Sequence, residues 1–429
     1  MRSRAYASVA VNQVDPAEFA HGRDGQDLVV GMDIGKYRLM ASGRWPDATF
    51  ARPWRVANPS EIPDLVRLLV QLNQGRRLVV AMEPSGTYGD ALRQALRDVG
   101  VAVQRVSPKA AHDYAEVFDG VPSQHDGKDA AVVAELAAIG KGRPWDYEPS
   151  SDWEAELGYW VERLAGQQRI AALGVGVIEA LLARHWPEAT RVLEVPSGTL
   201  LRVLARYGGP AALAADEQAA ARLTRWGGKL LAPEKVQALL ESARETAGVR
   251  QGEWDCRQLR EQAEQTRAAR REAARCKRQL QRLAQGHAVL EGQGRVVGMA
   301  TACVLYWCTG DPRDYPCAEA YRKAMGLNLT ERSSGIHQGE LSISKRGHPR
   351  SRQWLYLATL RLVKEAGVQR WYQAKKARDG NGAKRALVAV MRKLALALYH
   401  VGVNGGRFEA RRLFARIAKK IAATDGPKA

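Results

Sequence analysis

The sequence predicts an α/β domain followed by two mainly helical regions. Between residues 28 and 148, short apolar runs alternate with stretches of helical spacing, a layout typical of an α/β domain. Helix breakers are sparse from residue 151 to 285. We therefore expect four parts: a loosely ordered leader at 1–27, the α/β domain at 28–148, a helical and coiled-coil region at 149–288, and a mainly α-helical C-terminal domain at 289–429.

Apolar runs and their spacing predict the elements of the α/β domain. The predicted strands are residues 28–33, 37–42, 78–83 and 101–106, and the first two meet at a turn containing Gly35. The predicted helices are residues 62–72, 91–99 and 128–139. In the first of these helices, leucines recur on one side at positions three and four residues apart.

Residues 258–283 are rich in Gln, Glu, Arg and Ala and predict one long charged helix. Leucines are too sparse there for a strong heptad seam, so the helix is expected in either an antiparallel or an inter-subunit coiled coil. Further on, Gly292, Gly294 and Gly298 precede a predicted helix at 300–307. That glycine pattern fits a hairpin that grips the DNA backbone and fits a simple helix start equally well. Helices are also predicted at 353–363 and 382–401.

Positive charge is concentrated near the C-terminal end. The chain has 65 Lys and Arg against 46 Asp and Glu, a formal net charge of +19, and residues 342–429 hold 21 basic and 4 acidic residues. Such a segment attracts polyphosphate by releasing counterions. The alternative is a solvated tail, but the apolar run at 394–398 favours a folded helix. The charge therefore indicates nucleic acid as the partner.

The cysteine spacing and the hydropathy of the chain argue against a zinc protein, a disulfide-bonded protein and a membrane protein. The five cysteines are an odd number without CxxC spacing, which predicts reduced, mostly structural thiols and no zinc site. No apolar run approaches the roughly 20 residues of a membrane span, and no signal peptide is evident. We expect a cytoplasmic protein with no membrane partner.

Four carboxylates stand at positions that need an explanation. Asp33 and Glu83 each end a buried apolar run, and Asp126 and Asp129 repel each other on one helix face. Mg²⁺ offsets the negative charge of clustered carboxylates. Acids on two strands and a helix can hold the two metal ions used in phosphodiester chemistry. Taken singly, Asp33 fits a strand-end cap and Glu83, before Pro84, fits an ordinary turn residue. Taken together, the four favour a metal site for polynucleotide chemistry.

Three segments of the α/β domain resemble the DEDD transposases of bacterial insertion sequences. They are Asp33-Ile34-Gly35-Lys36, Glu83-Pro84-Ser85-Gly86-Thr87-Tyr88 and His125-Asp126-Gly127-Lys128-Asp129-Ala130. Their order and spacing match across residues 28–140. The resemblance implies a RuvC-like domain of the RNase H fold, in which Asp33, Glu83, Asp126 and Asp129 are catalytic and bind Mg²⁺ or Mn²⁺. Piv-type DNA invertases and bridge-RNA-guided recombinases are relatives in this family.

The C-terminal region resembles the transposase domain of the same family. The matching residues are Ala324-Met325-Gly326-Leu327, Ser333-Ser334-Gly335, Ser344-Lys345-Arg346-Gly347-His348 and Arg352. In that family the serine before the glycine is the DNA nucleophile, which points to Ser334. Leu329 replaces a usual proline, so Ser333 stays an alternative. A phosphate-binding role is expected for five basic residues, with plain solvation as the alternative for each: Arg332, Lys345, Arg346, His348 and Arg352.

The resemblance also implies how such an enzyme works. In relatives, the DEDD domain and the serine domain of different subunits form a composite site in a synaptic tetramer built from dimers. Cleavage gives a covalent phosphoserine link, and a noncoding bridge RNA pairs with donor and target DNA. The expected function is thus a bacterial insertion-sequence transposase or recombinase that is active at the nucleoid and guided by RNA.

Three alternatives stay open on the sequence alone. One is a RuvC-like structure-specific endonuclease in which water attacks and Ser334 is incidental. A second is a Piv-like site-specific DNA invertase. The third is an inactive nucleic-acid-binding protein that uses only its basic C-terminal region. Loss of the covalent adduct in Ser334→Ala separates the serine recombinases from the endonuclease, and loss of activity in Asp126→Ala excludes the inactive protein.

Overall fold

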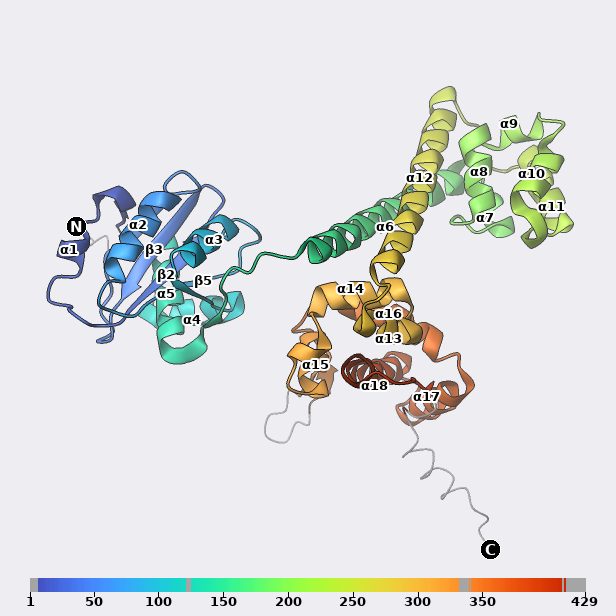
Figure 1. Ribbon diagram of the computed structural model, residues 1–429. Coiled ribbons are helices and arrows are strands. Elements are labelled where there is room, and N and C mark those ends of the chain that lie inside the picture. The colour runs from blue at the N-terminus through green and yellow to red at the C-terminus, as the bar shows by residue number, and fades with distance from the viewer. Residues whose placement is uncertain (1–6, 121–124, 332–338, 340, 411–412, 414–429) are drawn as a thin grey trace, which may run out of the picture. The chain divides into compact units, whose positions relative to one another are not determined.

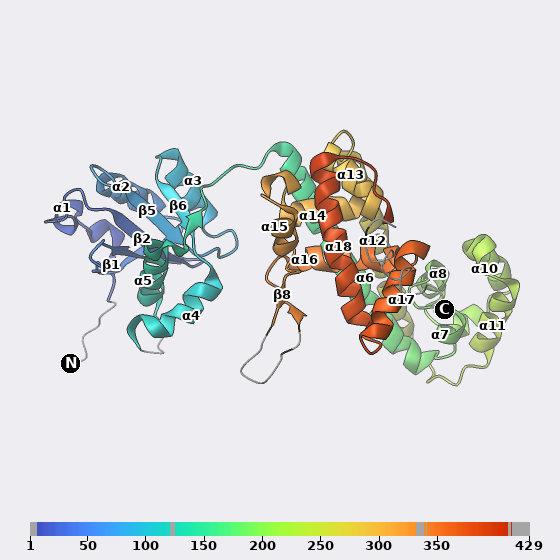
Figure 2. The same ribbon diagram turned by 90° about the horizontal axis from the view of Figure 1, so that it is seen from below.

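The computed structural model describes residues 7–120, 125–331, 339, 341–410 and 413. The chain divides into two compact units, Met1–Pro149 and Ser150–Ala429. The first is a mixed α/β unit, and the second is helical apart from one short β-hairpin (Figures 1 and 2). This agrees with the predicted fold class at the level of an α/β domain followed by mainly helical regions. The finer division into four parts stays a prediction.

A seven-stranded sheet forms the centre of the first unit, in the order β1-β4-β3-β2-β5-β6-β7. Strands β2, β5 and β6 run parallel, whereas β3 is antiparallel to both β2 and β4. The four predicted strands are confirmed as β2 (Leu28–Ile34), β3 (Arg38–Arg44), β5 (Leu78–Met82) and β6 (Ala102–Arg105). The remaining strands were not predicted: β1 (Val9–Ala10), β4 (Trp54–Ala57) and β7 (Arg143–Pro144).

Helices cover both faces of this sheet, because successive strand residues point to opposite sides. On one face, Leu28, Val30 and Met32 share a core with leucines of α2 (Ile62–Leu72) and α3 (Asp90–Asp98). On the other face, Ala81 packs with residues of α4 (Pro108–Asp119) and α5 (Asp126–Leu136). Of the α-helices that the structure describes between residues 28 and 148, α2, α3 and α5 were predicted and α4 was missed.

Residues 7–27 are more ordered than the expected leader. Strand β1 pairs with β4, and the Val11 side chain is buried in the sheet core. The ring of Phe19 lies edge-on to that of Trp54, with 5.0 Å between centroids. An apolar residue every few positions is enough to fix this segment to the sheet, although its overall composition is polar.

Two long helices organise the second unit: α6 (Asp152–His185) and α12 (Glu253–Leu283). They run antiparallel, since Trp153 Nε1 donates a hydrogen bond to the Leu283 carbonyl and Arg163 forms an ion pair with Glu272. Their backbones approach closely at Gly174, where a Cβ atom would lie 2.1 Å from Thr266 Oγ1. Of the two coiled-coil arrangements predicted, the structure shows the antiparallel one, formed within the chain.

Each end of the α6–α12 pair carries a separate apolar core. One core is formed with α7 (Ala189–Val192), α8 (Gly198–Tyr207), α9 (Pro210–Ala214), α10 (Ala219–Gly227) and α11 (Pro233–Arg244). The other is formed with α13 (Ala288–Val297), α14 (Met299–Thr309), α15 (Ala318–Ala324), α16 (Pro349–Leu362), α17 (Ala366–Arg378) and α18 (Ala383–Asn404). The helices predicted at 300–307, 353–363 and 382–401 are confirmed as α14, α16 and α18. Gly292 and Gly294 lie inside α13, and only Gly298, at φ 86°, joins α13 to α14.

Helix α18 corrects one expectation about hydropathy. Among the described residues it is the one helix long and apolar enough to cross a membrane, judged by length and composition alone. Its apolar face includes Val390, Leu394 and Leu398, which are buried in the core formed with α13–α16. The apolar length of α18 is therefore accounted for by a core position.

A candidate active site of clustered carboxylates

Two of the four predicted acids end neighbouring parallel strands. Met32 of β2 is the register partner of Met82 of β5, so Asp33 and Glu83 are the next pair along the same edge of the sheet. Alternation along each strand places Asp33 on the face of Gly31 and Glu83 on the face of Ala81. This is the face that α5 covers.

The other two acids occupy the first turn of α5, which begins at Asp126. The helix can lie against β2 because Gly31 has no side chain: a Cβ atom there would lie 2.1 Å from the Ala130 carbonyl oxygen. This close approach brings the first turn of α5 over the strand that carries Asp33. The four acids therefore come from two strands and a helix, as the sequence predicted.

Electrostatics shows that the acids interact with one another. Burial, with the charges of Asp129 and Asp126 adding to it, raises the pKa of Asp33 from 3.8 to about 6. Burial, followed by the charges of Asp33 and Asp129, raises the pKa of Glu83. Burial and then Asp126 raise the pKa of Asp129, which the nearby Lys128 partly offsets. The fold thus gathers negative charge that its own cations do not fully neutralise.

This donor set fits a hard divalent cation in its chemistry. All four side chains offer carboxylate oxygens, the ligands that Mg²⁺ prefers, and their mutual repulsion would be relieved by a positive ion. In the described part of the chain, no three His, Cys, Asp or Glu side chains are spaced closely enough to hold a metal as they stand. The fold brings the acids close enough to interact electrostatically, without forming a complete ligand shell.

Two ion pairs that the sequence analysis missed fix α5 in place. Lys128, only 1% exposed, places Nζ 2.6 Å from Asp119 Oδ1 and so ties α5 to α4. Arg44 of β3 binds Glu135 of α5, with 2.7 Å between Nε and Oε2. A basic residue inside the His125–Ala130 segment was a visible signal for the first pair. The second joins residues 91 positions apart and leaves no local signal.

Asn58 joins the two loops that follow the acid-bearing strands. Its Nδ2 donates hydrogen bonds to the Gly35 carbonyl at 3.0 Å and to the Tyr88 carbonyl at 3.2 Å. The side chains of Tyr37 and Tyr88 are exposed beside these loops. Asn58 therefore positions the backbone next to Asp33 and Glu83, a role that its place in the sequence did not reveal.

The second predicted site lies around a short β-hairpin of the second unit. Strand β8 (Leu329–Thr330) pairs with β9 (Ser342–Ile343). Ser333, Ser334 and Arg332 fall between these strands in the sequence and lie outside the described residues. The structure therefore describes the base of the hairpin but not the predicted nucleophile.

The described basic residues near this hairpin have different surroundings. Lys345 and Arg346 are exposed, and Lys345 has a φ of 55°. Arg352 Nη1 donates to the Gly347 carbonyl at 2.9 Å, and burial lowers the pKa of its guanidinium. Burial and then the charge of Arg350 lower the pKa of His348. The structure thus gives Arg352 a backbone-supporting contact, and phosphate binding by these four residues stays a prediction.

Comparison with known protein families finds a match for each of the two regions. A family model described as a transposase, of the DEDD type of IS110, matches residues 30–163. A second model, the transposase IS116/IS110/IS902 family, matches residues 294–374. The chain carries IS110-family transposase domains. No curated protein matches the chain.

Both transposase domains contain residues predicted from the sequence. The first match runs from β2 into α6 and includes all four carboxylates. The second runs from α13 into α17 and includes the two serines and all five predicted basic residues. The matches support a transposase of an insertion sequence, an enzyme that acts on DNA, and they do not test the role of any single residue.

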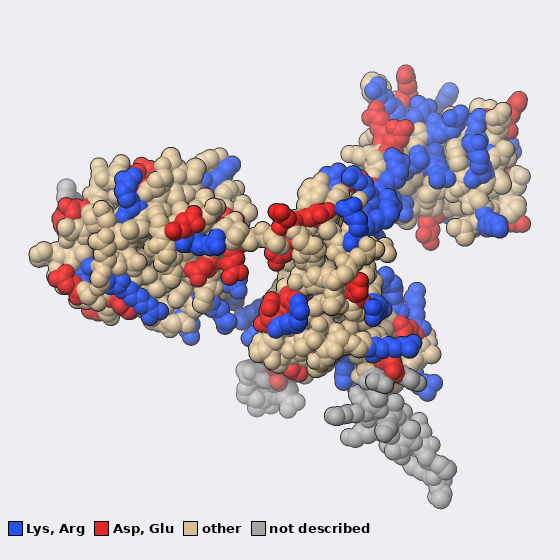
Figure 3. Space-filling model, viewed as in Figure 1, with Lys and Arg blue, Asp and Glu red and all other residues tan. Residues whose placement is uncertain are grey.

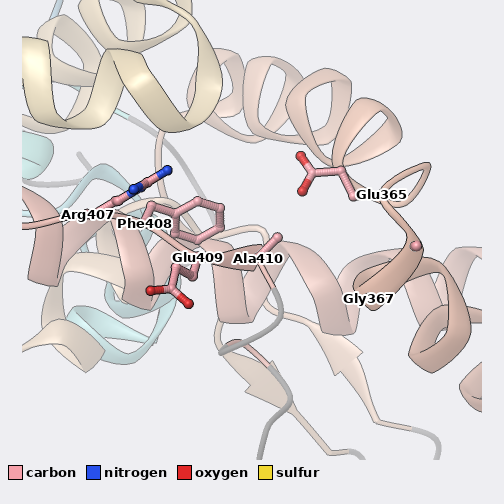
Figure 4. A pocket seen from close by; sticks show the side chains of 7 residues that line it. Glu365, Gly367, Arg407, Phe408, Glu409 and Ala410 are labelled. Carbon is pink, nitrogen blue, oxygen red and sulfur yellow. The ribbon is translucent and has the colours of Figure 1, made fainter.

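The transposase also has a hollow of about 430 Å³ away from the predicted residues. It lies in the second unit between the start of α17 and residues 407–410 (Figure 4). Glu365, Gly367, Arg407 and Phe408 line it, and it contains none of the predicted site residues. This hollow is therefore separate from the cluster of predicted carboxylates.

Proposed function

We propose that this transposase cuts and exchanges DNA strands at the carboxylate cluster through a covalent phosphoserine intermediate. The observation that carries the proposal is the mutual electrostatic coupling of Asp33, Glu83 and Asp129, to which Asp126 contributes. Repulsion between carboxylates does not stabilise a protein core. In a DNA-cutting enzyme the same carboxylates can bind a cation, which also faces the negatively charged phosphodiester.

Magnesium bound by Asp33, Glu83, Asp126 and Asp129 would stabilise negative charge developing on the phosphoryl oxygens. The raised pKa values of Asp33, Glu83 and Asp129 mean that these three carboxylates exchange protons for a cation more readily as the pH rises toward neutrality. Asn58 holds the two loops beside Asp33 and Glu83 in register with each other. The arrangement of strands and helices supports the proposal of a RuvC-like domain of the RNase H fold.

Ser334 is the proposed nucleophile, with Ser333 as the alternative. Its Oγ forms a bond to phosphorus while the bond from phosphorus to the oxygen of the leaving strand breaks. The serine proton passes to a base, and the leaving oxygen takes up a proton. Attack by the hydroxyl of an exchanged strand then reverses this step and releases the serine, so the number of phosphodiester bonds is conserved.

The family resemblance supports three further parts of the proposal. A noncoding bridge RNA pairs with donor and target DNA and so supplies sequence specificity, while the protein reads shape. Dimers assemble into a tetramer in which the two transposase domains of different subunits form a composite site. The reaction takes place in the bacterial cytoplasm. Whether sites are transposed or inverted depends on where they lie in the DNA.

The test combines purified protein, RNA, paired DNA sites and Mg²⁺, with denaturing gels to detect protein–DNA adducts and recombinant junctions. Wild-type protein and Ser333→Ala should form both, whereas Ser334→Ala should form neither. Asp33→Ala should lose both while still binding DNA. If Ser334→Ala still cuts without an adduct, the enzyme is a water-using endonuclease, and if it still forms an adduct that Ser333→Ala loses, Ser333 is the nucleophile. If junctions form without RNA, the guiding role of RNA is wrong, and an adduct at full yield in Asp33→Ala would overturn the metal site.

A further inference from the structure

One face of α12 carries a row of arginines that the carboxylate site does not use. Arg267, Arg271, Arg275, Arg278 and Arg282 are spaced by four, four, three and four residues, so they share one side of the helix. At about 1.5 Å per residue the row is about 22 Å long. It lies on the side away from the buried residues of α12, such as Cys276 and Leu280. We call it the arginine row.

The charges of α12 change character along its length. Before residue 265 the helix mixes signs, and Arg257 is paired with Glu261 at 2.8 Å. From residue 265 to 283 it has seven basic residues and one acidic residue, Glu272. Arginines four residues apart repel each other and weaken a helix. Solubility alone does not explain this run of positive charge, because a helix with alternating positive and negative side chains is also soluble.

Two acids contact the row without neutralising it. Glu272 is already bonded to Arg163 of α6 at 2.6 Å and lies 3.3 Å from Arg275, and Glu156 of α6 lies 3.4 Å from Arg282. Among the described residues, Arg271 and Arg278 form no ion pair. Arg267 also lies near like charges. Burial and then the positive charges of Arg271 and of Arg202 in α8 lower the pKa of its guanidinium.

A groove lies beside the arginine row. Its volume is about 580 Å³, and it lies between α6 and α12 within the second unit. Arg271, Arg275 and Arg278 line it from α12 and Arg163 lines it from α6. Ala268 and the acid Glu272 also line it. Figure 3 shows basic side chains gathered over α12 where it meets α6. A strip of cations along a shallow groove fits a long, regular polyanion.

We propose that the arginine row binds the phosphodiester backbone of a nucleic-acid duplex and so positions it along α12. This rests on the proposed function and adds a contact surface distant in sequence from both predicted sites. Duplex DNA carries one charge per about 1.7 Å of axis, so a row of about 22 Å faces more phosphates than it has arginines. Guanidinium groups recognise phosphate without regard to base sequence.

The experiment measures binding of the full-length protein to 30-base-pair duplex DNA and duplex RNA of one sequence, across a series of salt concentrations without Mg²⁺. Each phosphate contact that is lost lowers the slope of log affinity against log salt by about one. Arg271→Gln/Arg278→Gln should therefore reduce the slope by about two for the duplex that occupies the groove. Arg271→Lys/Arg278→Lys should keep the wild-type slope.

Matched controls remove the same charge elsewhere. Arg250→Gln/Arg257→Gln removes two arginines from the beginning of α12 and the turn before it, and should leave the slope unchanged. A slope change on DNA, on RNA or on both supports the proposal and identifies the duplex. An unchanged slope on both, or an equal loss in the control, overturns it. Poly-glutamate that competes as well as either duplex would also overturn it. Because binding is measured without strand cleavage, these outcomes are independent of Ser334 and of the carboxylates.

Discussion

Replacing Asp33 by Asn should stabilise the first unit while abolishing catalysis. Burial and the neighbouring carboxylates raise the pKa of Asp33 from 3.8 to about 6 in the folded protein. At about 1.4 kcal/mol per pKa unit this corresponds to about 3 kcal/mol against folding at high pH. Since the side chain is partly exposed, solvent screening reduces the expected gain in Asp33→Asn to about 1–2 kcal/mol. For a unit of this size that raises the melting temperature by about 2–8 °C.

The sign of the pH dependence follows from the direction of the shift. The folded state binds the Asp33 proton more tightly than the unfolded state, so the cost of this carboxylate is absent below pH 3.8 and complete above about pH 6. The advantage of Asp33→Asn should therefore be full at pH 8, and about half of it should remain at pH 5. Adding Mg²⁺ at pH 8 should raise the melting temperature of wild-type protein more than that of the variant.

The assay is calorimetric unfolding of the intact chain in EDTA at pH 5 and pH 8, with hydrogen exchange of the β2 and β5 amides reporting the first unit directly. Asp47→Asn is the matched control in the same unit. A hydrogen bond from the Thr49 hydroxyl and then one from Arg23 hold the pKa of Asp47 well below its usual range, so this variant should lose stability. Equal gains for Asp33→Asn at both pH values, or no gain at pH 8, would refute the reasoning.

Three further substitutions test how the site is held together. Gly31→Ala would place a Cβ atom 2.1 Å from the backbone of α5 and should cost about 1–3 kcal/mol in unfolding experiments, whereas Gly176→Ala has open space and should be neutral or stabilising. Lys128→Met breaks the ion pair with Asp119 and should cost about 2–3 kcal/mol, with part of the loss recovered in Lys128→Met/Asp119→Leu; an unrecovered loss would assign the effect to other contacts. Asn58→Ala should cost about 1–2 kcal/mol and speed hydrogen exchange in the loops after β2 and β5, and unchanged exchange there would contradict its positioning role.

Much of the fold was predictable because apolar spacing is a local property. The runs ending at Asp33 and Glu83 set strand length and side-chain alternation, and these place both acids at strand ends. The leucines of α2 likewise gave that helix its observed bounds. The missed strands are short, and β4 carries two buried residues, so its pattern is too brief to detect. Helix α4 lacks a clear apolar repeat, with Ala111 as its one buried residue.

The sequence by itself determined which residues carry charge and which elements carry them: two strand-end acids, a helix that starts with two more, and a basic C-terminal region. Only the tertiary structure decided which of these surfaces meet. The docking of α5 over Gly31, the loop contacts of Asn58 and the pairing of α6 with α12 join residues far apart in the chain. The physical reason is that spacing within an element is set by local backbone geometry, whereas contacts between elements depend on the packing of whole surfaces.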